Sequence, residues 1–270
     1  MVDAYVPPEV LRFRWTKVGK VRFLSHRDTA RVWERAAKRI ELPVARSGGF
    51  TPRPKIGFGL ALPTGAESYA EYLDVEIARD VPLPDLNALP ASLSAALPVG
   101  VDVSAVGRLE PRTPSLQRSV TTCDWAVVVH GLTPEVAQQR IDDVLAASSL
   151  PAVITRKGTE VEEDLRPAVV AVTAVSEPVL GDAPMIATRI VMTLANAAAL
   201  VAEGEGAAKT ARPGDITAAL FPGLATGVLR RTHQWIAIAD ERHEPLLLPL
   251  WAQPLEPAAV GATYAQARAS

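Results

Sequence analysis

The residues best suited to chemistry gather in one short segment near the N-terminus, residues 46–55, which reads RSGGFTPRPK. Its glycines and prolines predict a loop, so the cations Arg46, Arg53 and Lys55 should reach solvent. The ring of Phe50 lies between them in the sequence. Cations interleaved with an aromatic ring suit a nucleic-acid strand, because phosphates take the charge and a base stacks on the ring. The alternative is that Phe50 anchors the loop on the core and the prolines stiffen it.

A second group of candidate residues surrounds His26. Ser25 is placed to be the N-cap of a helix, and Asp28 follows three residues later as a weaker form of the capping box. Backbone N–H groups at a helix N-terminus attract anions, and nearby cations strengthen that attraction. The nearby cations are Lys20, Arg22 and Arg27. His26 could hydrogen-bond a phosphate or move a proton there, and it is a weak candidate for a catalytic residue. Alternatively, its ring bonds a nearby carbonyl group.

The charge distribution points to the same region. Residues 1–57 contain thirteen Lys and Arg against five Asp and Glu, a formal charge of +8. The remaining residues contain fifteen Lys and Arg against twenty-five Asp and Glu, a formal charge of −10. Such asymmetry predicts a site for a polyanion, unless several of the cations pair with acids elsewhere in the fold. We expect the two groups to form one concave basic patch, which Arg31, Arg35 and Lys38 continue along the helix.

Several classes of function are excluded by composition. A single cysteine, Cys123, rules out an iron–sulfur cluster and a cysteine-only metal site, and the four histidines lack metal-ligand spacing. Residues 57–59 (GFG) fall inside a predicted strand and so form no phosphate-binding loop. We therefore expect no metal and no cofactor, and we favour a protein that is not an enzyme. No apolar run approaches the roughly 18 residues of a membrane span, and the first residues lack a signal-peptide pattern. These features predict a cytoplasmic protein with no membrane association.

Alternating and helical periodicities predict the elements that position these groups. The predicted strands cover residues 12–18, 56–62, 72–77 and 101–106, and the predicted helices cover 26–41 and 86–97. The resulting β-α-β-β-α-β order is that of a ferredoxin-like (split βαβ) unit.

The first strand should turn Phe13 and Trp15 to the core and Arg12 and Arg14 to the open face. The neighbouring strand turns Tyr72, Asp74 and Glu76 to that face. We expect charges to pair across these two strands, which leaves the loop and the helix edge for nucleic acid.

The pattern restarts after a linker at residues 110–114. Strands are predicted at residues 124–130, 152–156, 168–175, 186–195 and 230–239, and helices at 134–147 and 213–220. The predicted fold class is therefore α+β, with two ferredoxin-like domains in tandem and antiparallel sheets. The first domain covers residues 10–109 and carries the basic loop. The second and less regular domain covers residues 115–250, and residues 251–270 form a flexible tail.

Short motifs in a fixed order resemble a known family, the radical-SAM-associated domain of unknown function. They are KVRFLSHRD (20–28), SGGFTPRPKI (47–56), LPTGAES (62–68), EYLD (71–74), TRKGTE (155–160), DLRP (164–167) and RPGD (212–215). That family occurs fused behind a radical-SAM, cobalamin-binding-like enzyme and also as a separate chain, and this sequence resembles the separate form. The resemblance implies a separate radical-SAM protein as partner and a role in RNA modification. It supplies no catalytic residues.

Three functions follow as hypotheses. The leading one is a non-catalytic RNA-binding or substrate-presenting accessory protein that works with a separate radical-SAM enzyme, with tRNA among the candidate RNAs. The second is a metal-independent, ribonuclease-like RNA-processing enzyme that uses His26. The third is a protein-interaction module with no nucleic-acid ligand, whose basic face binds an acidic surface.

Overall fold

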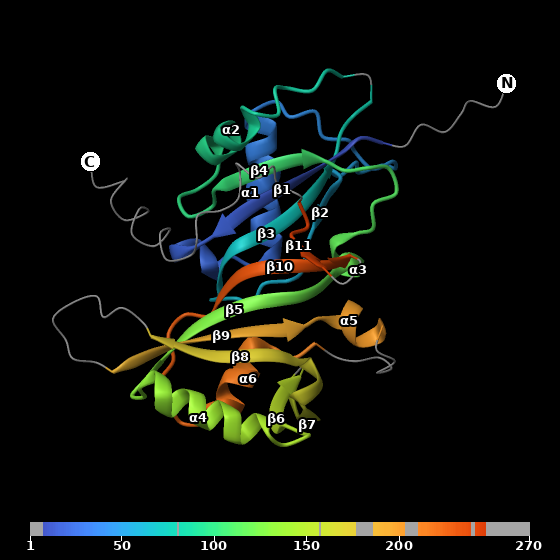
Figure 1. Ribbon diagram of the computed structural model, residues 1–270. Helices are drawn as coiled ribbons and strands as arrows, with labels where there is room; N and C mark the ends of the chain where they lie inside the picture. Colours follow the sequence, from blue (N-terminus) through green and yellow to red (C-terminus); the bar gives the residue numbers. More distant parts are fainter. Residues whose placement is uncertain are drawn as a thin grey trace, which may run out of the picture.

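The computed structural model describes residues 8–79, 81–156, 158–176, 186–202, 210–238 and 241–246. Together they form an α+β protein with one large, mostly antiparallel sheet and six α-helices (Figure 1). The predicted tail at residues 251–270, and residues 247–250 of the second predicted domain, lie outside the described residues. No described helix combines the length and the apolar composition that crossing a membrane requires.

The N-terminal half places two helices on one face of a four-stranded arrangement in the order β4-β1-β3-β2. Its elements are β1 (Val10–Lys17), the 3-10 helix η1 (Gly19–Phe23), α1 (His26–Arg39), β2 (Ile56–Phe58), β3 (Glu67–Glu76), α2 (Leu89–Ala96) and β4 (Val103–Arg108). Phe13 and Trp15 of β1 pack against Trp33 of α1, and the rings of Trp15 and Trp33 lie 5.5 Å apart. The alternation of β1 thus turns its large apolar side chains toward the helices, as predicted.

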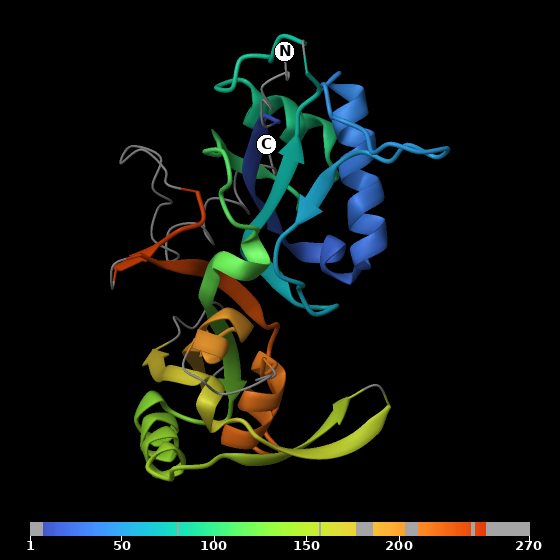
Figure 2. The ribbon, with the colours of Figure 1, turned by 90° about the vertical axis from the view of Figure 1, so that its right-hand side faces the viewer.

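The C-terminal half has strands in the order β10-β5-β9-β8. Its elements are α3 (Leu116–Ser119), β5 (Val120–His130), α4 (Pro134–Leu145), β6 (Pro151–Arg156), β7 (Thr159–Asp164), the 3-10 helix η2 (Arg166–Ala168), β8 (Val169–Ser176), β9 (Ala187–Ala195), α5 (Ala197–Ala202), α6 (Pro213–Leu220), β10 (Arg230–Ile238) and β11 (Glu241–His243). Ile141 of α4 and Leu220 of α6 pack with Val127 of β5 in the larger of two apolar cores. The pair β6–β7 forms a separate hairpin that projects from the molecule (Figure 2).

The two halves share one sheet, so the expectation of two separate antiparallel sheets is wrong. β3 pairs in parallel with β10 through Glu67↔Arg230 and Ser68↔Arg231. β2 is only three residues long and pairs with the far part of β3, from Leu73 to Val75. The near part of the same edge is left for β10, which satisfies backbone groups that an edge strand would leave open. The short length of β2 therefore leaves room on this edge of β3 for β10, which joins the two halves.

The open face of the first half is occupied by ion pairs. Arg12 makes a two-pronged contact with Asp74, at 2.7 and 2.8 Å, which confirms the predicted pairing across the two strands. Arg12 also donates to the carbonyl oxygen of Pro245, and Arg14 lies 3.3 Å from the carboxylate of Glu244. The last described segment thus covers this face, and the basic residues accessible to a ligand lie elsewhere.

Candidate functional site

The basic loop is a narrow hairpin that stands away from the sheet beyond α1 (Figure 2). Arg46 and Pro54 form an isolated antiparallel bridge, and the backbone N–H of Ser47 donates to the carbonyl oxygen of Arg53 at 2.9 Å. Gly49 takes a φ of 102° at the turn, which side chains rarely allow. Phe50 at the tip is 110% exposed, so the alternative in which its ring anchors the loop on the core is wrong.

The cations of this hairpin differ in whether they pair with an acidic side chain. Arg46 is exposed and donates to the carbonyl oxygen of Pro52 at 3.1 Å. Arg53 is exposed, and its side chain pairs with none of the residues that the structure describes. Lys55 instead lies 2.6 Å from Glu76, which offsets part of its charge. Arg46 and Arg53 are therefore the hairpin cations best placed for a phosphate.

The start of α1 has the predicted cap. The hydroxyl oxygen of Ser25 accepts from the backbone N–H of Asp28 at 3.2 Å and donates to its carboxylate at 2.7 Å. The hydrogen bond from Ser25 and the nearby arginines lower the pKa of Asp28. His26 is exposed and its ring meets the edge of Phe58 at 5.2 Å. No hydrogen bond from this imidazole to a carbonyl is found in the described part of the chain.

Replacing Ser25 with alanine tests this cap. The variant is expected to lose about 1 kcal/mol of unfolding free energy, within a range of roughly 0.5–2, because one N–H at the helix start loses its acceptor. Urea unfolding followed by circular dichroism measures the change. His26→Ala is a matched control beside it and should shift stability by less than about 0.5 kcal/mol, because the ring is exposed. Equal losses in both variants would contradict the assignment of the cap.

The two predicted groups of cations do not form one patch, and this corrects the sequence-based expectation. Arg22 lies 3.5 Å from Glu67 at the start of β3, whereas Lys55 pairs with Glu76 at its end. Nine residues of strand separate these carboxylates by about 30 Å, at about 3.3 Å per residue. Lys20, Arg22, Ser25, His26 and Arg27 therefore sit at one end of the half, and the hairpin at the other.

The exposed side of α1 connects the two groups. Arg31, Arg35 and Lys38 all lie exposed on this helix, as predicted. Arg31 also contacts Asp28 one turn earlier, at 3.2 Å. The helix begins beside Phe58, and the chain that follows it pairs with Ile77 through Val44. The cations of α1 therefore form a stripe between the two ends of the N-terminal half. We call this the α1 stripe.

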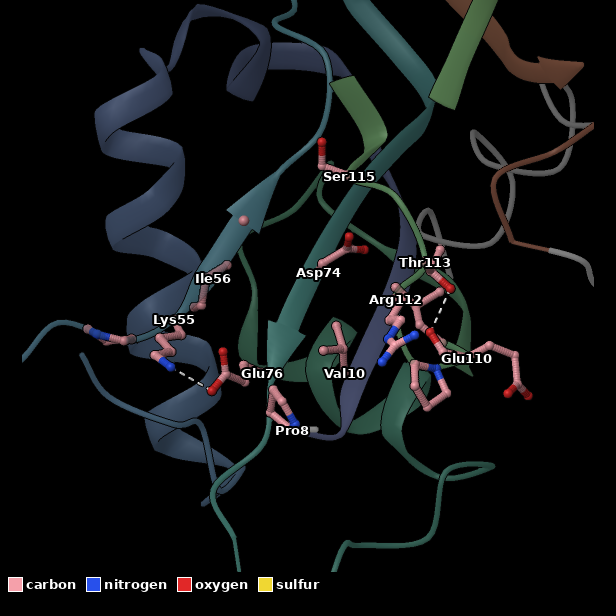
Figure 3. Close-up of a pocket in the computed structure, with 14 residues that line it drawn as sticks. Pro8, Val10, Lys55, Ile56, Asp74, Glu76, Glu110, Arg112, Thr113 and Ser115 are labelled. Carbon is pink, nitrogen blue, oxygen red and sulfur yellow. Dashed lines mark hydrogen bonds and ion pairs between the residues drawn. The ribbon is translucent and has the colours of Figure 1, made fainter. Parts of the chain in front are cut away.

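A groove of about 660 Å³ lies beside the base of the hairpin (Figure 3). Lys55 and Arg112 contribute positive charge to its lining, but Asp74, Glu76 and Glu110 contribute more negative charge. The Lys55–Glu76 contact crosses one side of it. This balance of charge makes the groove a poor site for a polyanion, despite its size.

A second cleft, of about 440 Å³, lies between the two halves. Residues 60–63 and 210–213 form its walls, Trp125 and Leu194 belong to its floor, and Arg156 lies at the end of β6. Sequence reasoning did not identify this cleft. One signal was present, because three of the family motifs, at residues 62–68, 155–160 and 212–215, converge on it.

Beneath the cleft lies a buried cluster of charges. Arg231, which is 1% exposed, donates to the carboxylate of Glu71 at 2.6 and 3.1 Å. Lys17 lies buried on the neighbouring strand, where its ammonium donates to the carbonyl oxygen of Leu24. Burial lowers the pKa of Lys17, and the negative charge of Glu71 acts against that shift. The carboxylate of Glu71 thus accepts from Arg231 and also places a negative charge near Lys17.

Among the described residues, no group of side chains suits a metal ion, and the thiol of Cys123 is buried. In the part of the chain that the structure describes, no three His, Cys, Asp or Glu residues come together as a metal site would require. Burial raises the pKa of Cys123 to about 11, which leaves its thiol protonated at neutral pH. His26 lines a cavity of only about 50 Å³, next to Lys17 and Glu71.

Comparison with known proteins identifies a family but no function. The profile of a family described as uncharacterized protein conserved in bacteria (DUF2344) matches residues 11–205. No curated protein sequence matches the chain. Among solved structures, the crystal structure of an unknown protein from Galdieria sulphuraria matches over 84% of this chain and 99% of its own. Its sequence identity is 13% and its TM-score 0.23, too low to support a structural argument.

Proposed function

The chain belongs to the DUF2344 family of uncharacterized bacterial proteins, and we propose that it is a non-catalytic, RNA-binding accessory protein. In this proposal it presents RNA, with tRNA among the candidates, to a separate radical-SAM enzyme. The observation that carries the RNA-binding part is the fully exposed ring of Phe50 between two solvent-exposed arginines. The link to a radical-SAM enzyme rests on the resemblance of the sequence motifs alone.

The geometry supports binding by an extended, single-stranded segment of RNA. The projecting hairpin holds Phe50 at its tip and Arg46 and Arg53 on its two arms, so that a base can stack on the ring while phosphates contact the arginines. The α1 stripe continues the positive charge over the length of a 14-residue helix. That length is about 21 Å, enough for several nucleotides of backbone. The hairpin supplies stacking, and the stripe supplies attraction for the strand that leaves it.

A charge reversal in the hairpin tests the proposal. Arg46→Glu combined with Arg53→Glu should weaken RNA binding by at least about tenfold at low salt. It should also flatten the salt dependence by about one unit of slope for each arginine–phosphate interaction that is removed. Fluorescence anisotropy with labelled mixed tRNA at two salt concentrations measures both quantities, and duplex DNA serves as a comparison ligand.

The matched control reverses two arginines outside the site, Arg118 on α3 and Arg140 on α4. Arg230 and Arg231 would be poor controls, because they are ion-paired with Glu67 and Glu71. The hairpin is structural if both proteins stay folded and bind RNA equally well. Wild-type binding of RNA that is weak and insensitive to salt would favour the protein-interaction module instead. Incubation of RNA with wild type and His26→Ala tests the ribonuclease alternative, which requires cleavage that the substitution abolishes.

The partner has its own test. A radical-SAM enzyme from the same organism should co-elute with this chain in size-exclusion chromatography, or form a complex once RNA is added. Separate elution under both conditions would contradict the accessory role while leaving RNA binding intact.

We also propose that the two halves are two ferredoxin-like units joined edge to edge. Each half has the chain order β-α-β-β-α-β if the β6–β7 hairpin and the short elements α3, α5 and β11 are set aside. Numbered within each half, both strand orders, β4-β1-β3-β2 and β10-β5-β9-β8, read 4-1-3-2. This agreement supports the proposal, which treats β6–β7 as an insertion in the second unit.

A further inference from the structure

The cleft between the two halves has the features of a ligand site that the proposed function does not use. Its floor comes from β5, β9 and β10, and the segment of residues 60–63 forms one wall. Thr210, Ala211 and Pro213 lie on the other side. In Figure 2 the turn before β3 and the β6–β7 hairpin both project on the side of the sheet that carries α1. The cleft therefore lies where the helices of the two halves leave the sheet uncovered.

The charge of the lining is positive and uncompensated within it. The lining contains three arginines, Arg156, Arg212 and Arg231, and no acidic residue. This distinguishes it from the groove of Figure 3, in which acids outnumber cations. Arginine is the side chain best shaped for a two-pronged contact with phosphate.

The three arginines differ in their freedom to bind. Arg231 is held by Glu71 and by the carbonyl oxygen of Leu60, so its charge is already paired and it is not free to contact a ligand. Arg156 is held by Glu163 and keeps a quarter of its side chain exposed. Arg212 is exposed, and its one hydrogen bond to a described residue is a long one, 3.4 Å, to the carbonyl oxygen of Thr155. Arg212 is therefore free to turn toward a phosphate.

A buried group of charges lies beneath the floor. Arg231 donates to the carboxylate of Glu71, whose negative charge also acts on the buried Lys17. Burial raises the pKa of Asp215, which follows Arg212 in the first turn of α6. An anion in the cleft would offset the charge of Arg212, the lining arginine that makes no ion pair with a described residue.

The remaining surface suits a flat, apolar ring. Leu60, Leu62 and Pro63 supply an aliphatic wall, and Leu194 adds apolar surface on the floor. Gln117 donates its side-chain N–H to the carbonyl oxygen of Phe58, which leaves its own carbonyl oxygen able to accept from a ligand. The volume of about 440 Å³ falls in the range of small-molecule sites and accommodates one nucleotide.

We propose that this cleft binds one nucleotide unit, with its phosphate on Arg212 and Arg156 and its base against the aliphatic wall. The unit is either a free nucleoside monophosphate or one unstacked nucleotide of an RNA strand. Binding in the cleft does not depend on RNA binding by the hairpin, because the two sites share no residue.

Isothermal titration with AMP and UMP tests the proposal on the full chain. Wild type should bind at least one of them with a dissociation constant below about 1 mM. Inorganic phosphate lacks the nucleoside and adenosine lacks the phosphate, so each should bind at least about tenfold more weakly than AMP. Arg212→Gln should weaken nucleotide binding about 10- to 150-fold, the usual effect of losing a charged hydrogen bond. Ala197→Phe, which fills the cleft from α5 and removes no charge, should abolish binding.

The control is Arg53→Gln in the hairpin, which should weaken RNA binding and leave AMP binding unchanged. Failure of the cleft and failure of the hairpin are thereby distinguished. Saturating RNA displaces AMP if the natural occupant belongs to RNA, and AMP binds undisturbed if the occupant is a free nucleotide. The proposal is overturned if wild type binds neither nucleotide at about 1 mM. It is also overturned if inorganic phosphate alone binds as tightly as AMP. The same holds if Arg212→Gln and Ala197→Phe both bind AMP like wild type, once thermal unfolding has shown that both variants are folded.

Discussion

Replacing Glu71 with glutamine is expected to lower the free energy of unfolding by about 3–5 kcal/mol, because it leaves a fully buried guanidinium without its counter-charge. Arg231 is 1% exposed, and Glu71 is its one carboxylate partner among the described residues. Arg231 also donates to the carbonyl oxygen of Leu60, which carries no net charge. Since Glu71 belongs to β3 and Arg231 to β10, this pair joins the two halves at the one place where their strands run parallel. The loss of this pair should therefore destabilise the sheet in both halves.

Denaturant unfolding gives the change in free energy, and a matched control lies on the same strand. Glu76→Gln removes the partner of Lys55 in a pair that keeps 43% and 25% of its side chains exposed. That change should cost no more than about 1 kcal/mol, because water can take the place of the carboxylate. The double variant Glu71→Leu with Arg231→Met should recover much of the stability, since no buried charge is left alone. A cost for Glu71→Gln as small as that of Glu76→Gln would show that the pair does not hold the halves together.

Replacing Phe50 with alanine is expected to weaken RNA binding by about 5- to 150-fold, the effect of removing one stacked base at about 1–3 kcal/mol. Unfolding should be unaffected within about 0.5 kcal/mol, because the ring makes no contribution to a core from its exposed position. A substitution that weakens RNA binding strongly and changes stability little indicates that the side chain contacts the ligand. Anisotropy titrations and thermal unfolding of the same preparations measure both.

Two further substitutions at the tip sharpen this test. Phe50→Trp keeps a stacking surface and should bind RNA at least as well as wild type, whereas Phe50→Leu keeps only apolar area and should behave like alanine. Binding by Phe50→Ala within about twofold of wild type would remove the main support for the proposed function. The nucleotide cleft would be untouched by that outcome.

The difference between the two sites bears on how the protein could work. The hairpin and the α1 stripe are open surfaces that suit a strand of RNA, and the cleft between the halves has a volume of about 440 Å³ that suits a single unit. The hairpin projects on the side of the sheet that carries α1, and so do the turn before β3 and the β6–β7 hairpin, which contribute residues to the cleft (Figure 2). If both proposals hold, a strand held by the hairpin and the stripe can place one nucleotide toward the cleft. The competition between AMP and RNA measures this arrangement directly.

Local features were determined by the sequence itself. The alternation in β1 placed Phe13 and Trp15 inside, and the Ser25 cap set the first residue of α1. The glycines and prolines of the hairpin indicated that Arg46 and Arg53 reach solvent, and cross-strand neighbours indicated the Arg12–Asp74 pair. Such features depend on side-chain periodicity and on contacts between residues of one element or of adjacent strands, so a single segment carries the information.

The tertiary structure decided which charges remain accessible and where they lie. Of the cations counted near the N-terminus, Arg12, Arg14 and Lys17 are buried, and Arg22 and Lys55 pair with opposite ends of β3. The single sheet and the cleft depend on residues more than one hundred positions apart, such as Glu71 and Arg231. Whether a cation is free depends on which acid the fold brings to it. The sheet edge that β2 leaves open admits β10, and that long-range pairing has no signature in either strand.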